Sequence, residues 1–267
     1  MSDLSYTASG HEKHPTLLFL HGFLGSSKDW REVIVSFDES FRCIAVDLPG
    51  HGKSLGMPAE NRAMEGAANE LLKVLDGLGI ERASIVGYSM GGRLALYFAL
   101  RFPERCEKLF LESASPGLKT EKERAARREA DEERAKRLEG GNFEEFLRDW
   151  HRQPLFTSLS RHEGLVEKLI ERRKDNVPRE LAKSLRGMGT GSQPSLWEKL
   201  KDLPVPTLAV AGGLDEKFVC IAREMAERSP RISPEIVPNA GHNVRLEAPG
   251  AYLSLSERFI SRFFAGG

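Results

Sequence analysis

Ser89 is the residue whose surroundings most clearly indicate nucleophilic or acid–base chemistry. It is the third residue of the pentapeptide GYSMG (87–91), which follows the apolar run Ala83–Val86 and precedes the helical pattern Gly92–Phe102. This strand–turn–helix context is what a G-x-S-x-G nucleophile elbow requires, because the tight turn has space only for small residues two positions before and after the serine. The hydroxyl then stands at a helix N-terminus, where backbone amides and the helix dipole favour negative charge.

A serine hydroxyl reacts only when a base and a group that orients this base are close to it, and both are expected later in the chain. With this elbow, the acid follows the serine and the histidine follows the acid. Asp215 comes after the strand-like run Pro206–Ala211, and His242 comes after the run Pro234–Val237. Both residues are therefore predicted at the carboxyl ends of strands, on the same sheet edge as Ser89, where they complete a Ser89–His242–Asp215 triad.

Other interpretations of these polar residues remain open. Asp215 also suits the N-cap of the helix expected over Glu216–Glu227. Glu112, which ends the apolar run Lys108–Leu111, is a rival for the role of the acid. His242 would be a hydrogen-bonded core or surface histidine if the triad does not form.

The stabilisation of an oxyanion requires two backbone N–H groups. One is expected from Met90, the residue after the predicted nucleophile. The other is expected from Phe23, in the loop HGFLG (21–25) that follows the run Leu17–Leu20. His21 of this loop is predicted to hold the loop through a hydrogen bond and not to act as the base.

Short apolar runs alternate with amphipathic stretches along the chain. The length of the runs and the glycines and prolines around them are typical of buried parallel strands, so the alternation predicts a doubly wound α/β sheet flanked by helices. The strand-like runs are Thr16–Leu20, Phe41–Val46, Ala83–Val86, Lys108–Leu111, Pro206–Ala211 and Pro234–Val237, and the main helical patterns are Ala63–Leu78, Gly91–Phe102, Phe218–Glu227 and Ala251–Phe264.

One region departs from this alternation. Residues 118–203 contain no convincing strand, and they open with Lys119–Glu139, which consists almost entirely of Lys, Arg, Glu and Ala. Most of these charges are expected on a solvated helix face. An all-helical insertion here would sit above the carboxyl edge of the sheet, where open α/β sheets bind ligands. We therefore predict a helical cap over residues 117–203, inserted into a core formed by residues 1–116 and 204–267.

Composition and charge exclude several classes of protein. The 267 residues are 40% apolar and 29% charged, and 39 Lys and Arg balance 39 Asp and Glu, so no global field attracts nucleic acid or an anionic membrane. No apolar run approaches the roughly 18–20 residues of a membrane span, and the N-terminus lacks the apolar core of a signal peptide. Three scattered cysteines indicate reduced, buried thiols and a cytoplasmic location. No metal-ligand spacing, dinucleotide fingerprint or P-loop is present, so no cofactor is expected.

Several motifs together resemble one known family across nearly the whole chain. They are the elbow with its following arginine, GYSMGGR (87–93); SPGL (115–118) before an Arg-rich helix; DWHRQP (149–154); GTGSQP (189–194); DEKF (215–218); and GHN (241–243). The elbow alone is shared by many esterases. The whole set resembles the MenH family, the 2-succinyl-6-hydroxy-2,4-cyclohexadiene-1-carboxylate synthases, within the α/β-hydrolase superfamily.

The resemblance implies a lyase of menaquinone biosynthesis. Such an enzyme eliminates pyruvate from 2-succinyl-5-enolpyruvyl-6-hydroxy-3-cyclohexene-1-carboxylate, with the serine of the triad as the base and the enolate of the succinyl ketone in the oxyanion hole. The resemblance also implies arginines that pair with the carboxylates of this substrate. Carried over by motif, the substrate-binding residues are Arg93, Arg127, Arg173, Tyr88 and Trp150, with Arg172 as a neighbour that could replace Arg173.

The position of Arg93 supports this reading independently. It lies one helical turn after Ser89, where a long cation is unexpected in an enzyme of apolar esters but suits a carboxylate, which a guanidinium fork binds bidentately. An internal salt bridge is the alternative for Arg93, and a solvated face is the alternative for Arg127 and Arg173. A serine hydrolase acting on an anionic substrate remains the alternative function. A complete triad disfavours a purely binding protein, and the sequence does not indicate the oligomeric state.

Overall fold

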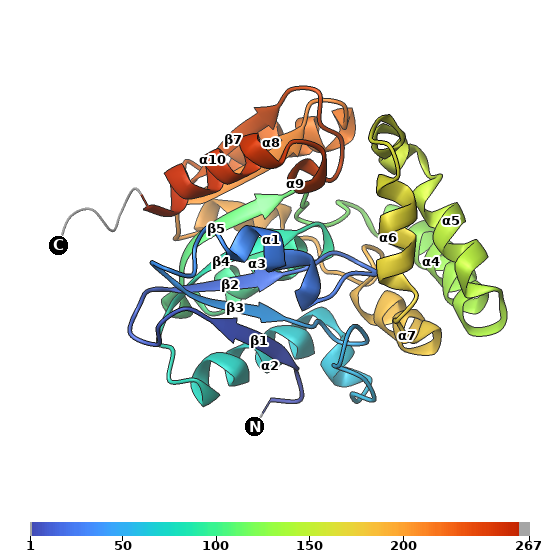
Figure 1. The fold of residues 1–267 in the computed structure, drawn as a ribbon, viewed down its shortest axis with the longest axis horizontal. Helices are drawn as coiled ribbons and strands as arrows, with labels where there is room; N and C mark the ends of the chain where they lie inside the picture. Colours follow the sequence, from blue (N-terminus) through green and yellow to red (C-terminus); the bar gives the residue numbers. More distant parts are fainter. Residues whose placement is uncertain (1, 262–267) are drawn as a thin grey trace.

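A seven-stranded sheet lies at the centre of the computed structural model, which describes residues 2–261. The strand order is β1-β3-β2-β4-β5-β6-β7, and every neighbouring pair is parallel except β1 with β3, which is antiparallel. The predicted mostly parallel sheet flanked by helices is thus confirmed (Figure 1). The strands are β1 (Tyr6–Ser9), β2 (Thr16–Leu20), β3 (Arg42–Val46), β4 (Ala83–Tyr88), β5 (Cys106–Glu112), β6 (Thr207–Gly212) and β7 (Ile232–Val237).

The sheet is covered on both faces because its central strands are apolar on both sides. Leu18 and Leu20 of β2 belong to a core cluster shared with α2, α3 and α8. Leu17 and Phe19 belong to a second cluster on the opposite face, shared with η1, α1 and α10. Since successive strand residues point to opposite faces, near-continuous burial along β2 requires both layers of helices. The helices are α1 (Arg31–Ile34), α2 (Met64–Gly77), α3 (Met90–Arg101), α4 (Glu121–Gly140), α5 (Phe143–His151), α6 (Leu165–Arg173), α7 (Pro178–Met188), α8 (Glu216–Arg228), α9 (Val244–Glu247) and α10 (Pro249–Ser261), with short 3₁₀ turns η1 (Ser27–Trp30), η2 (Glu60–Arg62), η3 (Pro103–Arg105), η4 (Pro154–Arg161) and η5 (Trp197–Asp202).

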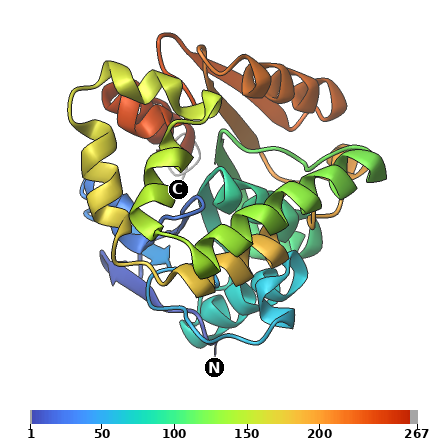
Figure 2. The same cartoon turned by 90° about the vertical axis from the view of Figure 1, so that its right-hand side faces the viewer.

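Helices α4 to α7 lie together at one end of the sheet, and they stand in front of it in Figure 2. Within the described residues, the chain between β5 and β6 forms helices and 3₁₀ turns but no strand. Helix α4 begins with a capping box, in which the Thr120 side chain accepts a hydrogen bond from the Glu123 amide and the Glu123 carboxylate accepts one from the Thr120 amide. The end of this segment packs against the sheet, because Trp197 and Leu200 of η5 belong to its core cluster.

The structure also departs from the sequence-based expectations at several points. Strand β1 was not predicted, because its four residues form no apolar run, are mostly exposed and pair only at the edge of the sheet. The last strand was predicted to begin at Pro234, but β7 begins two residues earlier, at Ile232. A proline is tolerated within β7 because β7 lies at the edge of the sheet. The predicted helix to Phe264 is α10, and residues 262–264 lie outside the described part of the chain. Cys220 on α8 is exposed, contrary to prediction, whereas Cys43 and Cys106 are buried.

None of the helices within residues 2–261 combines the length and the apolar character needed to cross a bilayer.

Candidate active site

The turn that carries Ser89 joins β4 to α3 at the point where the strand order reverses between β2 and β4. Ser89 has φ 48° and ψ −107°, a strained backbone conformation for a residue with a side chain. The neighbouring glycines are required by space: a Cβ at Gly87 would lie 2.6 Å from the Gly92 Cα, and one at Gly91 would lie 2.2 Å from the Leu20 carbonyl oxygen. The G-x-S-x-G spacing therefore reflects close packing of this turn against the sheet.

The three predicted triad residues meet at the carboxyl ends of β4, β6 and β7. His242 Nε2 lies 3.2 Å from Ser89 Oγ, and His242 Nδ1 lies 2.7 Å from Asp215 Oδ2. His242 is 1% exposed, and the Phe218 ring packs on its imidazole with the two ring centroids 4.7 Å apart. This geometry lets His242 accept the serine proton at Nε2 while Asp215 accepts the hydrogen bond from Nδ1–H.

Asp215 fills both roles that the sequence left open. One carboxylate oxygen contacts His242, and the other accepts a hydrogen bond of 3.4 Å from the Phe218 backbone N–H at the start of α8. Glu112 contacts the site differently: its backbone oxygen accepts the Ser89 N–H, and its carboxylate accepts the backbone N–H of Arg245. Asp215 is thus the acid at the imidazole, and Glu112 supports the turns beneath it.

Glu247 is a supporting residue that the sequence analysis missed. Its carboxylate accepts the backbone N–H of Gly241 at 2.9 Å and the backbone N–H of Asn243 at 3.2 Å, the residues immediately before and after His242. Glu247 is 9% exposed, so these charge-assisted hydrogen bonds are largely shielded from water. The carboxylate therefore fixes the turn that presents His242. In the sequence, the position of Glu247 five residues after His242 was the signal that could have indicated this role.

Glu247→Ala is expected to lower kcat by roughly 10- to 100-fold, because the turn that places the imidazole loses both of its acceptors and small misplacements of a catalytic group are costly. Glu247→Gln keeps one acceptor oxygen and should lose less. Steady-state kinetics with a melting curve for each variant measure both effects. A lower melting temperature with unchanged kcat would show that Glu247 supports only the fold.

Phe23 and Met90 are the residues predicted to supply the two oxyanion donors. Phe23 follows β2, Met90 is the first residue of α3, and both line the cavity that contains Ser89 and His242. Within the described chain, neither backbone N–H donates a hydrogen bond to another protein group. His21 holds the loop of Phe23, as predicted: its Nδ1 donates to the Gly22 carbonyl, and its Nε2 accepts the Leu48 N–H. Both donors thus remain available to a developing negative charge.

This cavity has a volume of about 180 Å³ and lies between the sheet edge and helices α4, α5 and α7. The predicted residues Tyr88 and Trp150 line it, and the Trp150 ring packs against Phe23 with a centroid distance of 5.0 Å. Four cationic side chains and no carboxylate line the cavity within the described residues; the cations are Arg93, Arg127, Arg134 and Lys217. In a chain with equal numbers of acidic and basic residues, this local excess favours a polyanionic ligand.

Arg93 is buried and makes no direct hydrogen bond or ion pair with a carboxylate among the described residues. Its Nη1 donates to Gln193 Oε1 at 2.6 Å, and its Nη2 donates to the Met188 carbonyl at 2.9 Å. Burial, and then the nearby Arg127, lower the pKa of Arg93 to about 10. Buried charges are normally paired, so a guanidinium held by neutral acceptors at the cavity wall is suited to receive a carboxylate. The internal salt bridge considered from the sequence does not form within this part of the chain.

Arg173, predicted to bind the substrate, lies outside the cavity around Ser89 and pairs with an acidic residue of the core. Arg173 Nη1 donates to Asp29 Oδ1 at 2.7 Å, and both side chains are more than 90% buried. Burial opposes ionisation of Asp29, but the attraction of Arg173 prevails and holds the Asp29 pKa at about 2. Arg173 therefore joins α6 to η1 and does not line the cavity around Ser89. Its neighbour Arg172 does not line the cavity either, and it pairs with Glu32 on the surface.

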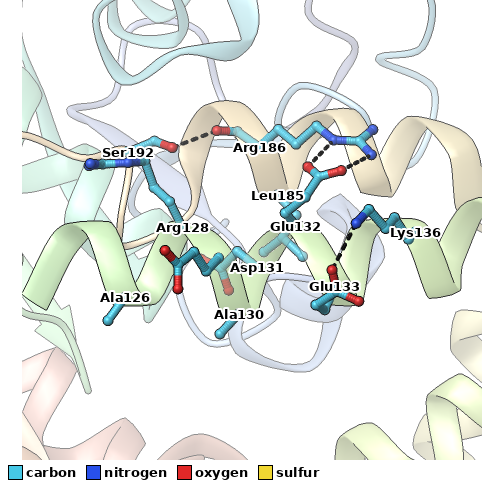
Figure 3. A pocket seen from close by; sticks show the side chains of 11 residues that line it. Ala126, Arg128, Ala130, Asp131, Glu132, Glu133, Lys136, Leu185, Arg186 and Ser192 are labelled. Carbon is cyan, nitrogen blue, oxygen red and sulfur yellow. Dashed lines mark hydrogen bonds and ion pairs between the residues drawn. The ribbon is translucent and has the colours of Figure 1, made fainter.

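A larger open groove of about 950 Å³ lies between α4 and α7, away from the triad (Figure 3). Two of its charged pairs are internal to the groove: Arg186 pairs with Glu132, and Lys136 pairs with Glu133. It lacks the predicted catalytic residues, and we assign it no role. Within residues 2–261, no group of three or more His, Cys, Asp or Glu side chains is arranged to hold a metal.

Comparison with known proteins agrees with the geometry. The family model described as alpha/beta hydrolase fold matches residues 15–249. The 2-succinyl-6-hydroxy-2,4-cyclohexadiene-1-carboxylate synthase of Serratia proteamaculans is 34% identical, covering 94% of this chain and 95% of its own length, and a Bacillus subtilis relative is 37% identical over 94% of this chain and 92% of its own. The solved structure of MenH from S. aureus superposes with a TM-score of 0.89 at 36% identity, covering 96% of both chains. The chain therefore belongs to the α/β-hydrolase fold family and, within it, to the 2-succinyl-6-hydroxy-2,4-cyclohexadiene-1-carboxylate synthases.

Proposed function

We propose that this protein is the carbon–oxygen lyase of menaquinone biosynthesis that forms 2-succinyl-6-hydroxy-2,4-cyclohexadiene-1-carboxylate. Its substrate is 2-succinyl-5-enolpyruvyl-6-hydroxy-3-cyclohexene-1-carboxylate, and pyruvate is the second product. The observation that carries the proposal is a triad opening into a cavity lined by four cations and no carboxylate within the described residues. The substrate carries three carboxylates, on the ring, the succinyl group and the enolpyruvyl group.

The reaction is a 1,4-elimination that the triad can drive. His242 draws the proton from Ser89 Oγ, and this oxygen removes the proton from ring carbon 2, next to the succinyl ketone. The electron pair moves onto the ketone oxygen, which the N–H groups of Phe23 and Met90 stabilise as an enolate. When the enolate collapses, the double bonds shift to positions 2 and 4 and the bond from carbon 5 to the enolpyruvyl oxygen breaks. Protonation of the released enolpyruvate gives pyruvate.

The cavity discriminates this substrate from a neutral ester. Arg93 offers its guanidinium one turn after the reacting serine, and Arg127 faces the cavity from α4. Tyr88 and Trp150 supply flat apolar surface for the ring of the substrate. We further propose that residues 117–203 act as the cap over this cavity, and that the enzyme works in the cytoplasm, where its three free cysteines stay reduced.

Arg93→Ala is expected to lower kcat/KM for the tricarboxylate substrate by roughly 10- to 200-fold, because a charge-assisted bidentate contact contributes about 1.5–3 kcal/mol. The effect on a neutral ester such as p-nitrophenyl acetate should be small. Arg93→Lys should recover only part of the loss, since an ammonium cannot reproduce the guanidinium fork.

The decisive measurement is pyruvate release from the enolpyruvyl substrate by the wild-type protein, followed by the two Arg93 variants. Melting temperatures control for the hydrogen bonds from Arg93 to Gln193 and Met188. Equal losses on the tricarboxylate and on the neutral ester, at unchanged stability, would contradict carboxylate recognition and favour a general serine hydrolase.

A further inference from the structure

Helix α4 presents a second arginine to the active-site cavity. Arg134 lies seven residues after Arg127, two helical turns along the same face, and both side chains line the cavity with Ser89. Both are about one-third exposed, as expected for long side chains at the mouth of a site. Neither the elbow nor the family motifs include Arg134, which lies within the charged run Lys119–Glu139, most of whose charges are expected on a solvated face.

One buried carboxylate fixes both arginines. Asp131 Oδ1 accepts a hydrogen bond from Arg127 Nε at 2.8 Å and another from Arg134 Nη1 at 3.1 Å, so the two guanidinium groups lie side by side. Asp131 is 3% exposed, and a Cβ at Gly189 would lie 2.7 Å from its other oxygen, so the glycine leaves room for this carboxylate.

The charges in this cluster do not balance. Two guanidinium groups share one carboxylate oxygen, so one positive charge remains, and the neighbouring buried Arg93 adds another that makes no direct hydrogen bond or ion pair with a carboxylate among the described residues. Elsewhere on α4, Lys136 has its own acidic partner, Glu133, and lies outside this cavity. An ion pair within α4 therefore neutralises the charge of Lys136. The Arg127–Arg134 pair, by contrast, retains a positive charge that can bind a further anion.

We propose that Arg134 is a further substrate-binding residue, which acts with Arg127 as a paired clamp for one carboxylate of the substrate, with Asp131 as the positioning residue of both. The inference rests on the proposed function and deepens it, because it assigns one of the three carboxylates to α4 and leaves another to Arg93. Side-by-side guanidinium groups provide several N–H donors in fixed directions, which suits a planar carboxylate.

Arg134→Gln is expected to lower kcat/KM for the enolpyruvyl substrate by roughly 5- to 30-fold, less than the loss expected for the buried Arg93 because the contact is partly screened by water. Turnover of p-nitrophenyl acetate should stay within about twofold of the wild type. Lys136→Gln is the matched control: it removes the same charge from the same helix, with the same spacing to its acidic partner, outside the cavity. It should leave both activities unchanged.

Binding is measured separately from turnover. Calorimetric titration of the Ser89→Ala variant with the enolpyruvyl substrate should give a dissociation constant that rises by a similar factor when Arg134→Gln is added. The dissociation constant for citrate, a simple tricarboxylate, should also rise when Arg134→Gln is added. If Arg134→Gln lowers the melting temperature, Arg134→Lys retains the charge and should keep part of the affinity.

The Arg127→Gln/Arg134→Gln double variant tests the shared carboxylate. If both arginines hold the same group, the double variant loses less than the product of the single losses. A fully multiplicative loss would overturn the clamp, and an Arg134→Gln loss no larger than that of Lys136→Gln would overturn the role of Arg134. If the wild type releases no pyruvate, the proposed function fails, while the citrate titrations still decide whether Arg134 binds a carboxylate.

Discussion

Replacing Ser89 by alanine is expected to lower kcat for pyruvate release by roughly 10⁴- to 10⁶-fold, the usual cost of removing a triad nucleophile. In this protein Ser89 Oγ is the atom that lies 3.2 Å from His242 Nε2, and it is the only group we assign to remove the substrate proton. Alanine removes this oxygen, and the imidazole then lacks the atom through which it reaches the substrate.

The fold should survive this substitution. The strained backbone at Ser89 is set by the packing of Gly87 and Gly91 against the sheet, and alanine keeps the Cβ that serine already places there. Substrate affinity of the variant should remain near that of the wild type, because the cationic side chains are untouched. More than one-tenth of wild-type activity in the variant would show that Ser89 is not the reacting group.

The triad was predictable because its residues follow from local rules. A strained strand-to-helix turn needs the small residues around Ser89, and the acid and the histidine occur where later strands end. Strand β1 was missed because an exposed edge strand needs no apolar run. Strands thus differ in how well the sequence predicts them because they differ in burial. Central strands carry an apolar run, whereas β1 is specified mainly by its pairing with β3.

The cationic residues show what the sequence could not provide. Arg173 and Arg134 both occur in charged helical segments, and nothing local distinguishes a cavity residue from one buried in an ion pair. Tertiary packing makes the distinction. Asp29 on η1 forms an ion pair with Arg173, whereas Arg134 lies with Arg127 on the face of α4 that lines the cavity of Ser89. The seven-residue spacing from Arg127 was the one signal that could have indicated Arg134.

Glu112 is expected to affect stability more than catalysis. Burial raises its pKa from 4.5 to about 7, against the opposing attraction of Arg245. The folded protein thus retains a proton that the unfolded chain has released, so the unfolding free energy should fall as pH rises from about 4.5 to 7, by an amount on the order of 3 kcal/mol. Glu112→Gln cannot titrate, and its stability should lack this fall while its kcat stays within about tenfold of the wild type.

Asp215→Asn should, by contrast, lower kcat by about 10⁴-fold. Asp215 Oδ2 accepts the Nδ1–H of His242 at 2.7 Å, which holds the imidazole with Nε2 free to take the serine proton and stabilises the imidazolium that forms. An asparagine amide facing Nδ1 would favour the other tautomer, with Nε2 protonated. The N-cap of α8 needs only an acceptor oxygen, so asparagine can retain it and the melting temperature should change little.

The pair Asp215→Asn and Glu112→Gln therefore separates the two carboxylates by their readouts. Both substitutions replace a carboxylate by its amide of equal size, at residues that each support a turn of the active site. The first should change kcat with little change in stability, and the second should change the pH dependence of stability with little change in kcat. A larger kcat loss for Glu112→Gln than for Asp215→Asn would move the acid to the end of β5, since the hydrogen bond to His242 would then not be the one that orients the base.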